Sequence, residues 1–154
     1  MNLHDYQEMV KATANYPKEF GLGYLTLGLM GEYQRFLQAS TEERLTEKFG
    51  SVCWFTAALC KEVEMPFLIV FAPSDMQFMP RGLSRTICIN TANRLLGEIA
   101  EMTKDHYKGE NYVDFINLSG ILCQFSIAVC RIASDYGVNV EEALQDSYDN
   151  LTTV

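Results

Sequence analysis

CWFTAALCK, residues 53–61, recurs seventy positions later as CQFSIAVCR, residues 123–131. Each segment begins with a cysteine, has a phenylalanine two positions later and a small hydroxyl residue after that, and ends with a second cysteine and a basic residue. Upstream, LMGE at 29–32 recurs as LLGE at 95–98. Repetition over most of a chain determines its architecture. Here it predicts two related helical hairpins whose matching positions can be compared.

Apolar residues recur at helical spacing along nearly the whole chain, and no segment reads as a paired strand. We therefore expect an all-α bundle of about six helices, in one domain over 1–154. The first half covers about 1–66, a proline-containing connector about 67–85, and the second half about 86–154. The expected helices are 3–14, 22–39, 41–64, 86–107, 111–136, and a last one that follows Asn139 and runs to 151.

Two pairs of residues have the spacing of a capping box, in which a side chain at the start of a helix and one three positions later bond to each other's backbone. Ser40 with Glu43 predicts the start of the third helix. Asn139 with Glu142 predicts the start of the last helix.

The formal net charge of −8 over 154 residues disfavours general attraction to a nucleic-acid backbone, although it is compatible with a local basic pocket for a small phosphate ligand. The N-terminal MNLHDYQEM has no basic start and no apolar stretch, and the longest apolar run, 67–72, is far shorter than the ~20 residues of a membrane helix. We expect a cytoplasmic protein without membrane contact, in the host cytoplasm if the source is viral. The five cysteines include no CxxC pair, so we expect buried thiols in a reducing compartment.

Acidic residues one helical turn apart are the first candidates for chemistry. Glu98 and Glu101 have this spacing, and Asp105 extends the same side of the helix. Two such helices facing each other could present carboxylates to Mg²⁺, which favours hard oxygen ligands. The alternative is a solvated acidic stripe, with a salt bridge to Glu98 from Arg94.

A family resemblance bears on this choice. LHDYQEMVKATANYPKEFGLGYLTLGLMGE at 3–32 and EKFGSVCWFTAALCKEVEM at 47–65 closely resemble the MazG-like nucleoside triphosphate pyrophosphohydrolases. The resemblance is weaker over 90–151, where VEEALQDSYDNL is similar to the family's closing helix, and tandem halves are also similar to the all-α fold of dimeric dUTPases. It implies a helical bundle that cleaves NTPs or dNTPs to a monophosphate and pyrophosphate with Mg²⁺. It also implies a homo-oligomer, either a dimer or a tetramer.

The family's acidic metal motif is incomplete in the first half. Its ExxE falls on Glu32 and Arg35, and its following ExxD falls on Lys48 and Ser51. These four positions carry a net charge of +1, where the family would have four carboxylates, so we expect no Mg²⁺ there. We expect instead that Glu32 pairs with Lys48 or Arg35, or that the cluster accepts a phosphate if it is partly open.

The second half departs from the motif in another way. Glu98 and Glu101 preserve the ExxE pattern, but the repeat places Leu118 and Ile121, which we expect in the core, at the second acidic pair. If the second acidic pair is instead placed one helical turn earlier, its two positions supply a carboxylate and an amide. The distance along the sequence from the ExxE pair favours this placement, whereas the offset between the two repeated halves argues against it. The alternative metal site then consists of Glu98, Glu101, Asp114 and Asn117.

Three hypotheses follow. In the first, the chain is a MazG-like nucleotide-binding protein with lost or weak hydrolysis, and Trp54 and Tyr24 could form walls for a base. In the second, it is an active Mg²⁺-dependent pyrophosphohydrolase with Glu98 and Glu101 as catalytic carboxylates. In the third, it is a non-catalytic interaction or inhibitor protein, of which a viral protein is one form, that uses an apolar patch within 67–79. The substrate-binding residues of the first hypothesis are Glu32, Arg35, Lys48, Trp54 and Tyr24.

Overall fold

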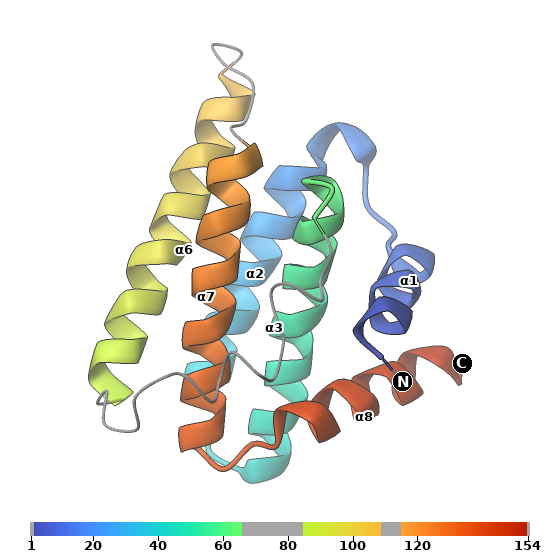
Figure 1. The fold of residues 1–154 in the computed structure, drawn as a ribbon, viewed down its shortest axis with the longest axis vertical. Coiled ribbons are helices and arrows are strands. Elements are labelled where there is room, and N and C mark those ends of the chain that lie inside the picture. Colours follow the sequence, from blue (N-terminus) through green and yellow to red (C-terminus); the bar gives the residue numbers. More distant parts are fainter. Residues whose placement is uncertain (1, 66–84, 109–114, 154) are drawn as a thin grey trace.

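Six α-helices and one short 3₁₀ helix form the described part of this computed structural model, which covers residues 2–65, 85–108 and 115–153 (Figure 1). No strand occurs in these three ranges, so the prediction of an all-α bundle is confirmed. The helices are α1 (Leu3–Thr13), η1 (Lys18–Phe20), α2 (Gly21–Gln38), α3 (Glu42–Glu62), α6 (Arg85–Tyr107), α7 (Phe115–Asp135) and α8 (Val140–Thr152).

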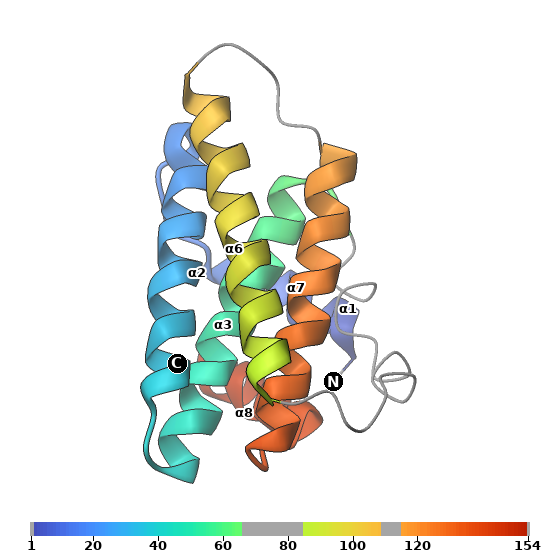
Figure 2. The same cartoon turned by 90° about the vertical axis from the view of Figure 1, so that its left-hand side faces the viewer.

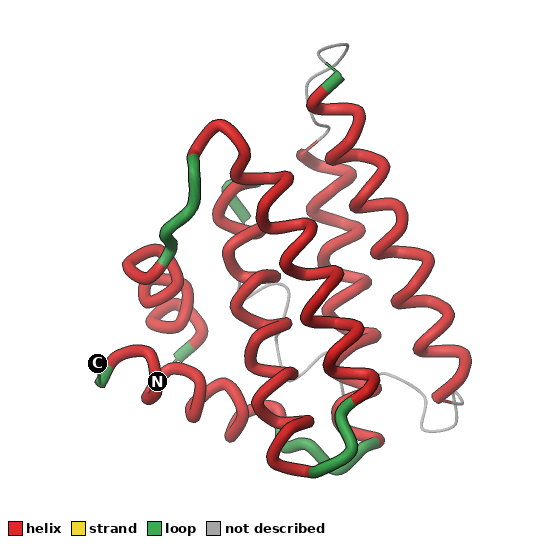
Figure 3. Tube along the Cα trace, turned by 180° about the vertical axis from the view of Figure 1, so that it is seen from behind, coloured by secondary structure: helices red, strands yellow, loops and turns green. Residues whose placement is uncertain are grey.

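Two helical hairpins lie side by side, as the repeat predicts. Helix α2 packs along α3, and α6 packs along α7 (Figures 1 and 2). The hairpins meet through α2 against α6 and through α3 against α7. Helices α1 and α8 pack against α3 and against each other, and α8 crosses the end of the bundle instead of running along it (Figure 3). Helix α3 therefore lies between the second hairpin and the two terminal helices.

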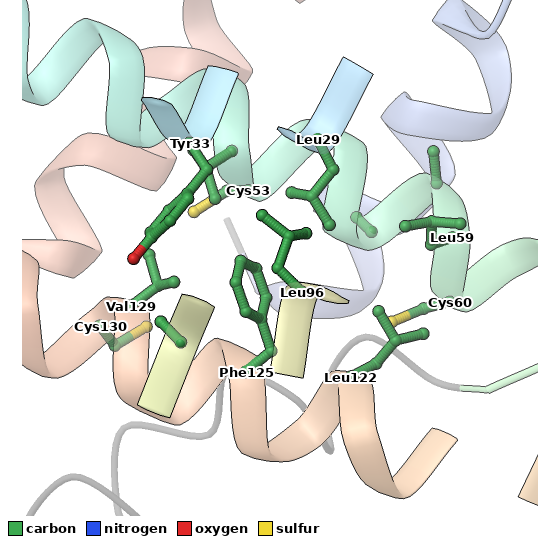
Figure 4. Packing of buried hydrophobic residues seen from close by; sticks show 14 of the residues in the cluster. Leu29, Tyr33, Cys53, Leu59, Cys60, Leu96, Leu122, Phe125, Val129 and Cys130 are labelled. Atoms are coloured by element: carbon green, nitrogen blue, oxygen red, sulfur yellow. The ribbon is translucent and has the colours of Figure 1, made fainter. Parts of the chain in front are cut away.

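The two repeated cysteine segments face each other across the α3–α7 contact. Burial raises the pKa of the Cys53 thiol, and the neighbouring Cys130 raises it further. Burial likewise raises the pKa of the Cys60 thiol, with a smaller contribution from the neighbouring Cys123. The first cysteine of each segment is thus the neighbour of the second cysteine of the other, as expected for two antiparallel copies of one helix. Figure 4 shows Cys53, Cys130 and Phe125 among the packed core side chains, and Phe125 packs edge-on against Tyr33 of α2 at 5.6 Å between ring centroids.

The buried hydrophobic residues of all six α-helices belong to one cluster. Two buried hydroxyls add polar contacts between the hairpins, because Thr26 of α2 and Thr103 of α6 share a hydrogen bond of 2.9 Å. Leu118 and Ile121 of α7 are buried, which confirms that they are core residues.

The starts of α1, α2, α3, α6 and α8 agree with the predicted positions to within one residue, with one correction to a cap, and the predicted start at 111 lies outside the described residues. The capping residue of α3 is Thr41, whose hydroxyl accepts a hydrogen bond from the Arg44 amide at 3.1 Å, so the prediction of Ser40 with Glu43 is wrong by one residue. A hydroxyl one position earlier lies outside the first turn and cannot reach its amides. At α8 the Asn139 cap is confirmed, since its side chain accepts from the Glu142 amide.

The predicted connector and the apolar patch at 67–79 lie outside the described residues, apart from Arg85, which already belongs to α6. The stretch Ile116–Asp135 is the one described helix long and apolar enough to cross a membrane, judged by length and composition alone. Just over half of it is buried inside the bundle, as expected of a core helix. The sequence shows no long uninterrupted apolar run there because polar residues such as Gln124 divide it.

Candidate functional site

The first-half positions of the acidic motif form an ion-pair network between α2 and α3. Glu32 accepts a hydrogen bond from Arg35 Nη1 at 2.9 Å and another from Lys48 Nζ at 3.3 Å. Lys48 also lies 4.0 Å from Glu47, and Glu47 accepts from Arg44 at 3.1 Å. Five side chains of alternating charge are thus connected from one helix to the next. We name them the α2–α3 network.

The two residues that bridge the helices are the most buried in this network. The Lys48 side chain is 11% exposed and that of Glu32 is 15% exposed, whereas Arg35 is 62% exposed. An ion removed from water needs a partner, because an unpaired buried charge costs several kcal/mol. The expected pairing of Glu32 is confirmed, and it involves Lys48 and Arg35 together instead of one of them.

The chemistry of this network differs from that of a metal centre. Its three cations and two carboxylates have a net charge of +1 on a chain whose net charge is −8. The Lys48 ammonium occupies the space beside Glu32 where a cation would have to bind. Arg35 keeps most of its guanidinium donors directed to solvent, since one bond to Glu32 uses a single N–H. The network can attract an anion but offers no set of carboxylates to Mg²⁺.

The second-half carboxylates lie on the surface of α6 and pair with cations of the same helix. Arg94 donates to Glu98 at 3.0 Å, as the stripe interpretation predicts, and Lys104 lies 2.7 Å from Glu101. The bond from Lys104 holds the pKa of Glu101 below its usual range. Among the residues that the structure describes, no group of three histidine, cysteine or acidic side chains is placed to hold a metal ion.

Of the two remaining members of the alternative metal set, the structure describes one. Asp114 lies outside the described residues, and Asn117 is exposed near the start of α7. The described residues therefore bring together Glu98 and Glu101 alone from that set.

The aromatic candidates lie along α2 and α3. Tyr24 stacks on Tyr16 at 5.6 Å between ring centroids, and it lies 6.4 Å from the Phe55 ring. Trp54 packs edge-on against Phe55 at 5.1 Å, and its indole N–H donates to the Thr13 hydroxyl at 3.1 Å. Tyr24 and Trp54 thus both contact Phe55, and both are partly exposed.

A groove of about 1370 Å³ runs between α3 and α8 and reaches the end of α1. Five of its lining residues are acidic, and Trp54 and Phe55 also line it. We name it the α3–α8 groove, and its acidic residues are Glu42, Glu43, Glu47, Asp146 and Asp149.

Sequence reasoning missed this groove and two members of the network. The spacing of Arg44 and Glu47, three apart on a helix, was a visible signal for an ion pair. Asp146 and Asp149 likewise share one side of α8 by spacing. The sequence contains no local signal that α8 crosses α3, because that contact is tertiary.

Comparisons with known proteins give no family to which this geometry can be assigned. No protein-family model, no curated protein and no solved structure matches the chain.

Proposed function

We propose that this chain is a non-hydrolytic, phosphate-binding protein on a MazG-like helical scaffold, and that its ligand is a nucleotide. The observation that supports this most is the Lys48–Glu32–Arg35 cluster between α2 and α3. The resemblance puts a four-carboxylate metal motif at these positions, and phosphoryl transfer depends almost wholly on such charge placement. An ammonium in that place removes the metal but leaves a locally positive site.

Phosphate binding would use the exposed side of the network. Arg35 is mostly exposed and has unused donors in a fork that matches phosphate oxygens. Lys48 is more buried than Arg35 and adds a second positive charge beside Glu32. A phosphate that bound here would share these cations with Glu32 and would require no divalent ion.

A base would stack on the aromatic residues of the same two helices. Trp54 follows Lys48 by six residues, which separates the two by ~9 Å along the axis of α3 and by about 120° around it. Tyr24 also lies near Phe55 and is 47% exposed. Aromatic faces accept any base, so this part of the proposal names no particular nucleotide.

Calorimetry against a panel of NTPs, dNTPs and their monophosphates, in EDTA, tests the proposal. We expect binding that weakens at least tenfold in Arg35→Ala/Lys48→Ala. The matched control is Arg94→Ala/Lys104→Ala, which removes two surface cations that also pair with carboxylates of their own helix. Absence of binding by every nucleotide, or equal loss in both double variants, would contradict the proposal.

The hydrolase hypothesis predicts a different result. It requires Mg²⁺-dependent release of pyrophosphate that Glu98→Gln or Glu101→Gln abolishes. We favour the non-hydrolytic protein because each of these carboxylates is bonded to a cation of α6. Release of pyrophosphate from any common NTP or dNTP by the unmodified chain would support the hydrolase instead.

We also propose a homo-oligomer, as the resemblance implies. The start of α2 offers a surface for it, because Tyr24 and Leu27 are exposed three residues apart and Leu27 is 72% exposed. Phe20 of the preceding η1 is also exposed. Light scattering after size-exclusion chromatography tests this. A dimer or tetramer is expected, and Leu27→Glu should dissociate it, whereas a monomer at tens of micromolar would contradict the proposal.

A further inference from the structure

The α3–α8 groove has a single sign of charge. None of its lining residues is lysine, arginine or histidine. Glu47 is balanced by Arg44 and Lys48, but the four other acidic residues of the groove form no ion pair with any described residue. Low-dielectric walls of one sign focus the field and concentrate counter-charge between them. The groove is therefore complementary to a cationic partner.

The groove is larger than a usual small-molecule site. Its volume of about 1370 Å³ exceeds the roughly 300–1000 Å³ of usual small-molecule pockets. Between its acidic walls lie residues with short side chains, among them Gly50, Ser51, Ala143 and Ser147. Gly50 and Ala143 are buried, and a Cβ at Gly50 would lie 3.5 Å from Ser147 Cβ. The two helices are thus in close contact at this part of the groove lining.

One part of the groove is aromatic. Trp54 and Phe55 contribute to its lining, and the indole is held in position by its bond to Thr13. Fixed indole and phenyl rings bind apolar anchors and also the cations of lysine and arginine. Few side chains combine these two properties, and they are the ones that recur at the centres of protein interfaces.

From these three features we propose that the α3–α8 groove is a docking site for a lysine- and arginine-rich segment of a protein partner. The basic residues of the segment lie between the carboxylates of α3 and α8. An apolar or arginine side chain of the segment contacts Trp54. This goes beyond nucleotide binding, since it involves a different ligand, and most of the groove lies outside the α2–α3 network.

A natural reporter is already present, because Trp54 is the only tryptophan of the chain. The probe is a twelve-residue peptide with alternating lysine and alanine and one central leucine. We expect it to change Trp54 fluorescence saturably, and to bind more weakly as NaCl rises from 50 to 300 mM. Its counterpart with glutamate in place of lysine should not bind. Equal binding of the two peptides would overturn the proposal.

Two double variants of α8 locate the site. Asp146→Asn/Asp149→Asn removes two groove carboxylates and should weaken peptide binding at least tenfold. Glu141→Gln/Glu142→Gln makes the same change of charge on exposed residues of the same helix that do not line the groove, and should leave binding within about twofold. Circular dichroism verifies that both variants fold. Equal weakening in the two variants would show an effect of net charge alone and would overturn the proposal.

A small polycation separates a docking groove from a simple counter-ion site. Spermine at the same concentration of charge should bind at least tenfold more weakly than the peptide, because it has no apolar anchor for Trp54. Equal affinity of spermine would contradict docking of a protein segment. Peptide binding should persist in Arg35→Ala/Lys48→Ala, so failure of the nucleotide proposal and failure of this one give different results.

Discussion

Lys48 of α3 and Glu32 of α2 form an ion pair of 3.3 Å across the first hairpin, with both side chains largely buried. The carboxylate is shared with Arg35, and the ammonium with Glu47, so the pair is the centre of a connected network. A bridge of this kind holds two helices together without a bound metal. Its consequences can be measured separately from any ligand.

The first prediction concerns the energy of that pair. Lys48→Met should lower the free energy of unfolding by about 2 kcal/mol, because it leaves Glu32 mostly buried with one partner. Arg35→Met removes the exposed partner of the same carboxylate and should change stability by less than about 0.5 kcal/mol. Urea unfolding followed by circular dichroism measures both. Equal losses of stability in the two variants would contradict the assignment of Lys48 as the buried partner of Glu32 and Arg35 as the exposed one.

The second prediction concerns the close contact between α2 and α3. A Cβ at Gly28 would overlap the Phe55 ring, so Gly28→Ala should destabilise the fold by about 1–2 kcal/mol as the ring moves aside. Gly31 lies about one turn further along α2, and a Cβ there would meet no described atom within 4 Å. Gly31→Ala should therefore stabilise by ~0.5–1 kcal/mol through helix propensity. Thermal unfolding compares the two, and a gain in stability for Gly28→Ala would be inconsistent with this packing.

The third prediction concerns the cap of α3. Thr41→Ala removes the acceptor for the Arg44 amide and should cost ~1 kcal/mol. Ser40→Ala, at the adjacent position that the sequence pattern favours, should have an effect near zero. Chemical denaturation of the two variants distinguishes the caps, and a larger loss for Ser40→Ala would place the cap at Ser40 instead.

The fourth prediction concerns alkaline pH. Burial raises the pKa of Cys53, Cys60 and Cys130 above the usual value of 9.0, so the folded protein keeps protons that the unfolded chain releases. Stability should therefore fall as pH rises above about 9, with a slope that approaches ~1.4 kcal/mol per pH unit for each thiol. Urea midpoints between pH 8 and 10 measure the slope.

A variant separates the thiols from other titrating groups. Cys53→Ala should lower stability at every pH through the cavity that it leaves, but its pH profile should be less steep by the contribution of one thiol. If stability did not change with pH up to pH 10, or if Cys53→Ala gave the same slope as the unmodified chain, the pH dependence could not be assigned to the buried thiols.

The fold could be predicted from the sequence because the helical patterns are local and the cysteine segment occurs twice. The cysteine segments mark the buried faces of α3 and α7, and their antiparallel packing pairs Cys53 with Cys130, as expected for two copies of one motif. The cap of α3 was misplaced by one residue because Ser40 and Thr41 are both good capping residues in sequence. Such boundaries depend on the backbone angles at a single position.

Part of the candidate site could be predicted from the sequence. Pairing of Glu32 followed from the replaced acidic positions, since a carboxylate beside a lysine and an arginine is expected to bind them. The α3–α8 groove was not predicted, because its carboxylates come from two helices about a hundred residues apart in sequence, and only the tertiary contact brings Glu43 and Asp146 to one groove. Local periodicity contains no information about that crossing.

The central proposal is that the α2–α3 network binds a phosphate group of a nucleotide without a divalent metal. Isothermal titration calorimetry of the unmodified chain with nucleotides, first in EDTA and then in Mg²⁺, with pyrophosphate measured in the same samples, tests it most directly. The account predicts saturable binding of at least one nucleotide in EDTA, unchanged within about twofold by Mg²⁺, with no pyrophosphate released. Binding that requires Mg²⁺ and is accompanied by pyrophosphate release would contradict it.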